Sequence, residues 1–359
     1  MNQMSLQHRN RRFLLAAALV IMAIAAPLVI RSRARHPHIL IREQFLKLGT
    51  LVEISIPCPP EREAEAREAI CAAAAEIDRL EVLWSRYRPD SDVSRINLAA
   101  GREAVHVSSD TLELVESAAN ISRITGGAFD ISFASVGKLW RLKQDDPRIP
   151  SPEEIRESLP LVNFHNIIVN REEGSILLKD KGMMIDLGGI AKGAAVDRAI
   201  AVIRKQGFSH ALVNAGGDIY AMGKNAVHRP WRVAVRHPRD RELFLGKVDL
   251  TGAAIVTSGD YERGITVDGR RYHHILDTHT GYPAEKCISV TVIAPDAMTA
   301  DAIATALFVM GPHEGVRFVN EREGVESLII GPDMVPYASS GFPRLSDPPE
   351  PAETPFPTP

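Results

Sequence analysis

Apolar residues recur every three or four positions in several long segments, a spacing that predicts amphipathic helices. Ser108 suits the N-cap of one of these helices, and Gly207 suits the C-cap of another. Short apolar or alternating runs between them predict strands. The predicted helices are Glu61 to Trp84, Ser108 to Thr125, Ile190 to Gln206 and Asp296 to Gly311. The predicted strands are Phe45 to Pro57 (broken early by Gly49-Thr50), His165 to Val169, Ser175 to Leu178, His210 to Val213, Trp231 to Val235, Leu245 to Leu250 and Ala253 to Thr257.

The order of these elements favours an α+β fold, in which helices pack on a mixed and largely antiparallel sheet. Asp268-Gly269, between Ile265 and Tyr272, is a strong signal for a β-hairpin. A polar stretch from Ser85 to Asn97 predicts a loop. The strand followed by Gly-Gly at 185–189 recurs near 213–217, which is compatible with an internal duplication.

The two ends of the chain differ from this body. Three arginines, at positions 9, 11 and 12, precede an apolar run from Phe13 to Ile30, which predicts a signal peptide or an uncleaved membrane anchor within 1–35. Either version puts the body in the periplasm or at the periplasmic face of the inner membrane. The body then spans 36–341, and Pro-rich sequence without apolar periodicity predicts a disordered tail over 342–359.

Composition narrows the classes of function. The chain has 359 residues, 45% of them hydrophobic, and a net charge of −3 with acidic and basic residues interspersed. Nucleic acid is therefore an unsuitable partner, because no sustained basic patch is present. The cysteines, Cys58, Cys71 and Cys287, lack CxxC spacing, which argues against a zinc site or a disulfide framework. With nucleic acid excluded, the expected partners are small molecules or proteins.

The first candidate site is the stretch from Met183 to Asp197. An apolar run reaches Asp186, Gly188-Gly189 follows, and the predicted helix then begins, so the segment is interpreted as strand, tight turn and helix. Glycines at such a corner let backbone N–H groups approach a phosphate, and Lys192 adds a positive charge one turn into the helix. The alternative is a structural corner whose glycines only relieve crowding.

The second candidate site lies in the last predicted helix. Asp301 and Thr305 are four residues apart and share one face, so a carboxylate and a hydroxyl can both ligate one hard cation such as magnesium. The alternative is that Asp301 complements the helix N-terminus and Thr305 bonds back to a carbonyl.

Other polar or aromatic residues have similar double interpretations. The Tyr87 ring can stack on a planar ligand, or it can pack at the edge of the hydrophobic core. The Asp130 carboxylate can accept hydrogen bonds from nearby backbone amides or from a ligand. His274 and Asp277 can form a base and its orienting group, or His274 can be a structural histidine.

Taken together, these motifs resemble the FAD:protein FMN transferases, the ApbE family. The resemblance spans about Leu48 to Gly311. It rests on Leu48-Gly49-Thr50, Ser85 to Asn97, Gly127 to Ile131, Asp186 to Asp197, Asn214 to Asp218, Thr257 to Arg263, His274 to Pro283 and Ala300 to Thr305. Members commonly have Met where this chain has Leu48, Tyr where it has Ala194, and Pro where it has Thr278.

The resemblance implies both the fold and the site: two similar α/β halves, and FAD as the substrate. The residues implied to contact FAD are Leu48, Tyr87, Ala128, Phe129, Asp130, Asp186, Lys192 and His274. Magnesium is implied at Gly189, through its carbonyl, with side-chain oxygens from Asp301 and Thr305. His274, oriented by Asp277, is the candidate catalytic residue that helps to deprotonate the incoming hydroxyl.

The implied reaction transfers FMN from FAD to a threonine or serine of a target protein, with release of AMP. The implied acceptor is a membrane-bound electron-transfer protein, which suits an exported enzyme. Two alternatives are a magnesium-dependent FAD pyrophosphatase, in which water replaces the protein hydroxyl, and a flavin-binding protein without turnover.

Overall fold

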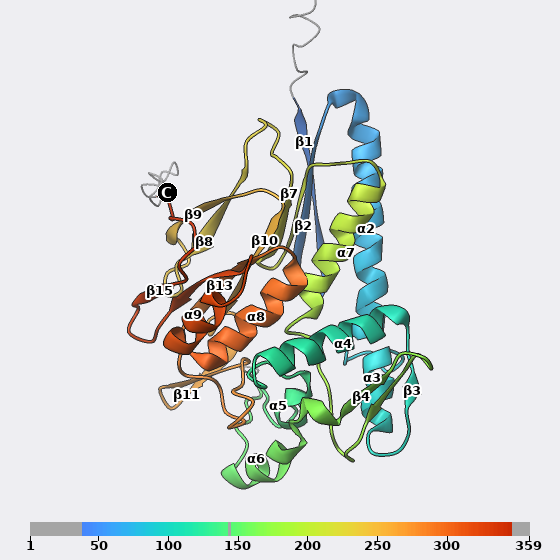
Figure 1. Ribbon diagram of the computed structural model, residues 1–359, viewed down its shortest axis with the longest axis vertical. Coiled ribbons are helices and arrows are strands. Elements are labelled where there is room, and N and C mark those ends of the chain that lie inside the picture. The colour runs from blue at the N-terminus through green and yellow to red at the C-terminus, as the bar shows by residue number, and fades with distance from the viewer. Residues whose placement is uncertain (1–37, 143–144, 347–359) are drawn as a thin grey trace, which may run out of the picture.

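One antiparallel sheet of eight strands organises the molecule. The computed structural model describes residues 38–142 and 145–346, and every strand pair in this part of the chain is antiparallel. The strands follow the order β1-β2-β6-β7-β10-β13-β14-β15 (Figure 1). Their bounds are β1 Ile39–Lys47, β2 Thr50–Cys58, β6 Ala211–Ala215, β7 Asp218–Met222, β10 Ala253–Gly259, β13 Ser289–Ala294, β14 Glu326–Ile330 and β15 Pro336–Ala338.

Both faces of this sheet are covered, because its central strands alternate between two hydrophobic cores. On β10, Ala254 and Val256 join the larger core, while Ile255 joins a separate cluster on the opposite face. Four helices cover the face with the larger core: α2 (Glu63–Trp84), α7 (Ala191–Lys205), α8 (Ala297–Met310) and α9 (Pro312–Asn320). The opposite face is covered by the hairpin of β8 (Trp231–Arg236) and β9 (Phe244–Leu250).

The segment between α2 and α7 forms a second region at one end of the sheet, in the lower part of Figure 1. It contains a three-stranded sheet and several helices. These elements are α3 (Asp92–Ala99), β3 (Val105–His106), α4 (Ser109–Ile124), α5 (Ala134–Gly137), α6 (Pro152–Ser158), β4 (Ile167–Asn170) and β5 (Ser175–Leu178). A further hairpin, β11 (Gly264–Val267) with β12 (Arg270–His273), follows β10 in the chain.

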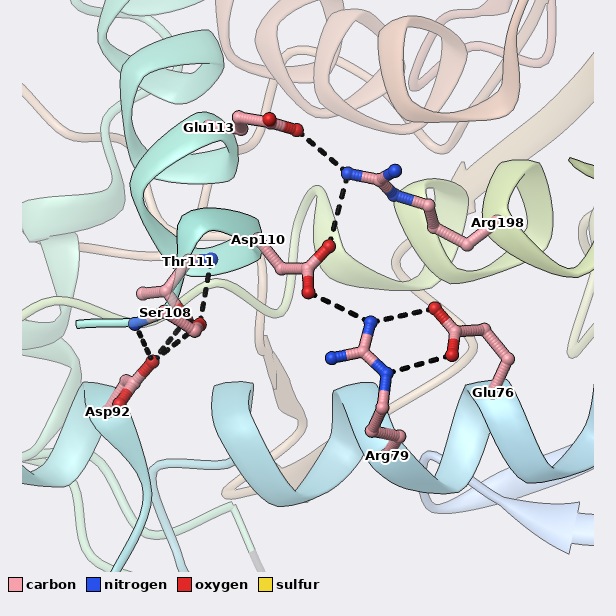
Figure 2. A network of polar contacts seen from close by, with 8 residues as sticks. All are labelled: Glu76, Arg79, Asp92, Ser108, Asp110, Thr111, Glu113 and Arg198. Carbon is pink, nitrogen blue, oxygen red and sulfur yellow. Dashed lines mark hydrogen bonds and ion pairs between the residues drawn. The ribbon is translucent and has the colours of Figure 1, made fainter. Parts of the chain in front are cut away.

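Charged side chains join helices of the two regions. Asp110 on α4 forms an ion pair with Arg79 of α2 at 2.8 Å and another with Arg198 of α7 at 3.1 Å (Figure 2). Nearby, the buried Asp92 carboxylate accepts hydrogen bonds from the backbone and hydroxyl of Ser108. The helix that carries Lys192 is thus held against α4 as well as against the main sheet.

The predicted helices are confirmed, with ends that differ by a few residues. Ser108 caps α4 by accepting from the Thr111 amide. Gly207, at a φ of +81°, ends α7 in a Schellman motif, in which the Phe208 N–H donates to the Ile203 carbonyl. The α+β fold and the Asp268-Gly269 hairpin are confirmed as well.

Several local predictions were wrong. The early break expected at Gly49-Thr50 is a full reversal of the chain: Leu48 and Gly49 both have positive φ and form the turn of the β1–β2 hairpin. The expected loop at 85–97 contains the start of α3, since Ser91 caps that helix by accepting from the Ser94 amide. The strands β8 and β9 do not extend the main sheet but pair with each other. Residues 183–187 form no strand, and Asn97 binds both the N–H and the C=O of Ile185.

The two Gly-Gly segments do not share one structure. Gly216-Gly217 forms the turn of the β6–β7 hairpin, whereas Gly188-Gly189 leads into a helix. The repeated pattern therefore gives no support for a duplication.

The chain ends fall largely outside the described residues. The expected export segment at 1–35 and the tail residues 347–359 both lie there. The described start of the expected tail is packed: Phe342 and Leu345 contact the cluster under β8 and β9, and Ser346 exchanges backbone hydrogen bonds with Lys247. Within 38–142 and 145–346, no helix has the length and apolar character needed to span a bilayer.

Candidate active site

The candidate site lies at the end of the main sheet where two hairpin turns meet. The β1–β2 turn and the β6–β7 turn touch each other, since the Gly216 N–H donates to the Leu51 carbonyl at 3.0 Å. Gly216 has a φ of +64°, and a Cβ there would lie 2.4 Å from Thr50 Oγ1, so only glycine fits this contact. The β6–β7 turn ends at Asp218, the first residue of β7.

Lys192, in the first turn of α7, places its ammonium between two buried carboxylates. The Nζ atom lies 2.5 Å from Oδ2 of Asp218 and 3.5 Å from each carboxylate oxygen of Asp301. Asp218 is 2% exposed and Asp301 is 3% exposed. Burial alone would lower the pKa of Lys192, but the two carboxylates outweigh it and raise the pKa above its ordinary value. Lys192 is therefore charged, and its partly exposed side chain joins two buried carboxylates in one cluster of three ionisable groups.

The pKa of Asp218 is shifted by this arrangement. Burial raises the pKa of its carboxyl above the ordinary value, and the neighbouring Asp301 raises it further, while Lys192 acts in the opposite direction. With both carboxyl groups ionised, the two carboxylates and one ammonium have a formal charge of −1, which favours the binding of an additional cation.

The start of α7 is pressed against the start of α8. A Cβ on Gly193 would lie 2.1 Å from the Ala297 carbonyl oxygen, so this helical position requires glycine. The Gly193 N–H donates to Oδ2 of Asp301 at 3.2 Å, which places the Asp301 carboxylate at the positive end of the α7 dipole. Asp301 does not cap its own helix; Asp296 does so by accepting from the Thr299 amide.

Gly189, Asp301 and Thr305 lie together, as expected for a shared cation site. A Cβ on Gly189 would lie 3.4 Å from Oγ1 of Thr305, and the Thr305 hydroxyl donates to the Asp301 carbonyl at 3.2 Å. The back-bond proposed as the alternative for Thr305 is thus present, and its hydroxyl oxygen still keeps acceptor capacity for a cation.

These residues fit magnesium by their chemistry. A carboxylate, a hydroxyl and a backbone carbonyl are hard oxygen donors, which magnesium prefers. Within the described ranges, no group of three or more His, Cys, Asp or Glu side chains is placed to hold a metal. A cation bound here would therefore complete its shell with oxygens from the main chain, a hydroxyl, water or the substrate.

Asp186 and Tyr87 are linked through an arginine that the sequence analysis did not single out. Asp186 accepts from the Gly188 amide at 2.8 Å and forms an ion pair with Nε of Arg86 at 3.0 Å. The Arg86 guanidinium lies 4.9 Å from the centre of the Tyr87 ring, which is 81% exposed. Tyr87 therefore does not close a core edge, and its ring is open to a planar ligand.

The segment from Ala128 to Asp130 is buried beneath the site. The Phe129 ring lies next to Gly189, where a Cβ would be 3.4 Å from its Cε2 atom. Asp130 accepts from the Ser132 amide and hydroxyl and from the Phe164 amide, and burial raises its pKa. The capping interpretation of the Asp130 side chain is thus confirmed; contact of this segment with FAD stays a prediction.

His274 follows β12 and keeps part of its surface exposed, whereas the preceding His273 is buried. Nδ1 of His274 lies 3.2 Å from the Arg263 carbonyl, which can only accept, so Nδ1 carries the proton and Nε2 has a free lone pair. Desolvation lowers the pKa of His274, and the Lys192 ammonium acts in the same direction, so the ring is neutral at pH 7. The predicted orienting role of Asp277 was wrong, because its carboxylate accepts from the His279 amide instead.

The β1–β2 turn at Leu48-Gly49 lies close to Arg263, and Arg263 in turn binds His274. A Cβ on Gly49 would lie 3.8 Å from a guanidinium nitrogen of Arg263, the residue whose carbonyl holds His274. The Leu48 N–H donates to Glu81 at 2.8 Å. Thr278, at the turn after Asp277, donates its hydroxyl to the Gly127 carbonyl at 2.7 Å, which fixes that turn without a proline.

Sequence reasoning missed Asp218 as a site residue. The available signal was an acidic residue directly after a Gly-Gly turn, in Asn214-Ala215-Gly216-Gly217-Asp218. A separate cavity of about 530 Å³, between α4 and α7, contains none of the predicted site residues in its lining.

The family model described as the ApbE family matches residues 48–329, which include all the elements of this site. The chain belongs to the ApbE family. A relative from Klebsiella pneumoniae (strain 342), named FAD:protein FMN transferase, is 35% identical over 256 residues, or 71% of this chain and 79% of that protein. Another from Treponema pallidum (strain Nichols), with the same name, is 32% identical over 312 residues, or 83% and 86% of the two chains.

Solved structures of ApbE proteins have the same fold. The ApbE protein of Thermotoga maritima superposes with a TM-score of 0.78 at 34% identity, covering 85% of this chain and 98% of that one. The flavin transferase ApbE from Vibrio cholerae gives a TM-score of 0.76 at 29% identity, covering 85% and 99%.

Proposed function

We propose that this ApbE-family chain is a magnesium-dependent enzyme that transfers the FMN part of FAD to a threonine or serine hydroxyl of a protein. The observation that supports it most directly is the meeting of Lys192, Asp301, Thr305 and Gly189 at one end of the sheet. A charged ammonium, a helix N-terminus and hard oxygen donors together suit a pyrophosphate with its cation.

In the proposed reaction the acceptor hydroxyl oxygen bonds to the phosphorus of the FMN half. The bond from that phosphorus to the bridging oxygen breaks, and AMP leaves with the electron pair. Lys192 would hold the pyrophosphate and stabilise the charge that develops on the leaving phosphate. Magnesium at Gly189, Asp301 and Thr305 would supply further charge neutralisation there.

His274 is the proposed acceptor of the hydroxyl proton. Its ring is neutral and its Nε2 lone pair is free, which are the two properties that a general base needs. The exposed Tyr87 ring beside Arg86 and Asp186 would contact the flavin or adenine ring system. Leu48, Ala128 and Phe129 would complete the FAD site.

The proposed acceptor is a membrane-bound electron-transfer protein, and the proposed location is the periplasm or the periplasmic face of the inner membrane. The arginines and apolar run at 9–30 support export, as a cleaved signal peptide or as an anchor in contact with the membrane.

Mass spectrometry of a co-incubated acceptor tests the function. The purified chain, FAD, magnesium and an acceptor domain should give a covalent FMN adduct on a threonine or serine, together with AMP. EDTA should prevent both products, and excess magnesium should restore them. AMP and free FMN without an adduct would identify a pyrophosphatase, and bound FAD without AMP would identify a flavin-binding protein; either result contradicts the proposal.

A further inference from the structure

We propose that Asp218 is a positioning residue that holds the Lys192 ammonium away from Asp301 and so keeps the Asp301 carboxylate available to a divalent cation. This inference rests on the proposed function, because it concerns the magnesium requirement of the same site. Asp218 is not among the residues that the family resemblance implied as ligands of FAD or metal.

The first observation is the asymmetry of the two ion pairs. Lys192 lies 2.5 Å from Asp218 but 3.5 Å from Asp301, although both carboxylates are buried. The closer contact is a charge-assisted hydrogen bond, and the longer one is at the limit of hydrogen-bond geometry. Lys192 is therefore bound mainly to Asp218, and Asp301 keeps lone pairs that no strong donor occupies.

The second observation is that Asp218 sits on a rigid support. It begins β7 directly after a turn in which the Gly217 N–H donates to the Asn214 side chain at 2.9 Å. The Gly216 N–H donates to Leu51 across the hairpins, and β7 is paired on both sides, with β6 and β10. The long side chain of Lys192 is flexible, so its ammonium is positioned by the fixed carboxylate of Asp218.

Competition for Asp301 follows from charge. An ammonium and a divalent cation both favour the same buried carboxylate, so a lysine released from Asp218 would turn to Asp301 and oppose metal binding. With Asp218 present, the lysine has a partner of its own, and the cation meets a carboxylate whose other main donor is the Gly193 amide.

The variant Asp218→Asn tests this, because it keeps the side-chain shape and removes the charge. The midpoint of magnesium binding, followed as the thermal shift of the FAD-loaded protein without acceptor, should rise at least tenfold. A tenfold change corresponds to about 1.4 kcal/mol. The magnesium concentration for half-maximal FMN transfer should rise by the same factor.

A double-mutant cycle shows whether Asp218 acts through Lys192. In a Lys192→Met background, Asp218→Asn should change the magnesium midpoint no more than about twofold, less than 0.5 kcal/mol. A shift as large as in the wild-type background would mean that Asp218 attracts the cation directly, which overturns the proposal. An unchanged midpoint in the single variant would overturn it as well.

Two control variants separate the expected effect of Asp218→Asn on magnesium binding from a folding defect. Asp92→Asn removes another buried carboxylate, which is bonded to Ser108 and Thr111, and should lower the melting temperature without moving the magnesium midpoint. If the Asp218→Asn variant does not fold, Asp218→Glu replaces it in the test. Because glutamate keeps the negative charge, its magnesium midpoint should lie close to that of the wild type. A wild-type protein that transfers no FMN would contradict the proposed function instead.

Discussion

The Asp197 carboxylate on α7 accepts a hydrogen bond from the Ala297 backbone N–H at 2.9 Å, at the first residue of α8. Its second oxygen accepts from the Met298 N–H at the same distance. One side chain thus satisfies two free amides at the start of the helix that carries Asp301. The joint between α7 and α8 therefore contains both the half-buried Asp197 carboxylate and the tight contact at Gly193.

Asp197 predicts a pH dependence of stability. Burial raises the pKa of its carboxyl to about 7, above the value of about 3.9 expected in an unfolded chain. The unfolded chain therefore releases this proton first, and stability falls as the pH rises from about 4 to about 7. Because the group is partly exposed, we expect the effect to be no more than about 2 kcal/mol.

The variant Asp197→Asn should remove that dependence. Urea unfolding at pH 5 and pH 7.5 should show a smaller difference in unfolding free energy for the variant than for the wild type. Asp296→Asn is the matched control, since asparagine also caps helices and the same end of α8 is changed. An equal reduction in both variants would refute the role of Asp197.

Gly193→Ala should separate the two helices. A Cβ that meets a backbone carbonyl at 2.1 Å forces α7 or α8 to move, which we expect to cost about 1–3 kcal/mol and to lower FAD affinity. Equilibrium unfolding and FAD fluorescence titration measure the two effects. Gly207→Ala, at the far end of α7, should cost stability through its positive φ but leave FAD affinity unchanged.

The Thr305 hydroxyl can be tested by two substitutions of similar size. Thr305→Val keeps the shape and removes the oxygen proposed as a magnesium ligand, so the magnesium concentration for half-maximal transfer should rise about tenfold. Thr305→Ser keeps the oxygen and should stay near the wild type. A valine variant with wild-type magnesium dependence would exclude Thr305 from the cation site.

The lowered pKa of His274 predicts a flat rate profile on the acid side of neutrality. A histidine with a pKa of about 6.5 is about three-quarters protonated at pH 6, which would reduce a base-dependent rate about fourfold. The wild-type rate should instead fall less than twofold between pH 8 and pH 6, and His274→Gln should lower it at both values. His279→Gln, an exposed histidine on the next turn, should have no effect on the rate.

Local sequence patterns predicted the elements of this site better than their connections. Lys192, Asp301 and Thr305 could be singled out as candidates because helical periodicity places each at a definite turn of its own helix. Asp218 was missed because its partner is 26 residues away across a strand and a turn, and no local pattern reports such a contact. The hairpin at Leu48-Gly49 was missed because leucine rarely adopts positive φ, here +54°.

Asn97 shows how far the site extends along the chain. Its side-chain amide forms hydrogen bonds with both the N–H and the C=O of Ile185, 88 residues away. One side chain of α3 therefore helps to fix the position of the residue directly before Asp186. A substitution at position 97 is therefore expected to shift the position of Asp186 and the following glycines while leaving α7, α8, Asp301 and Thr305 unchanged.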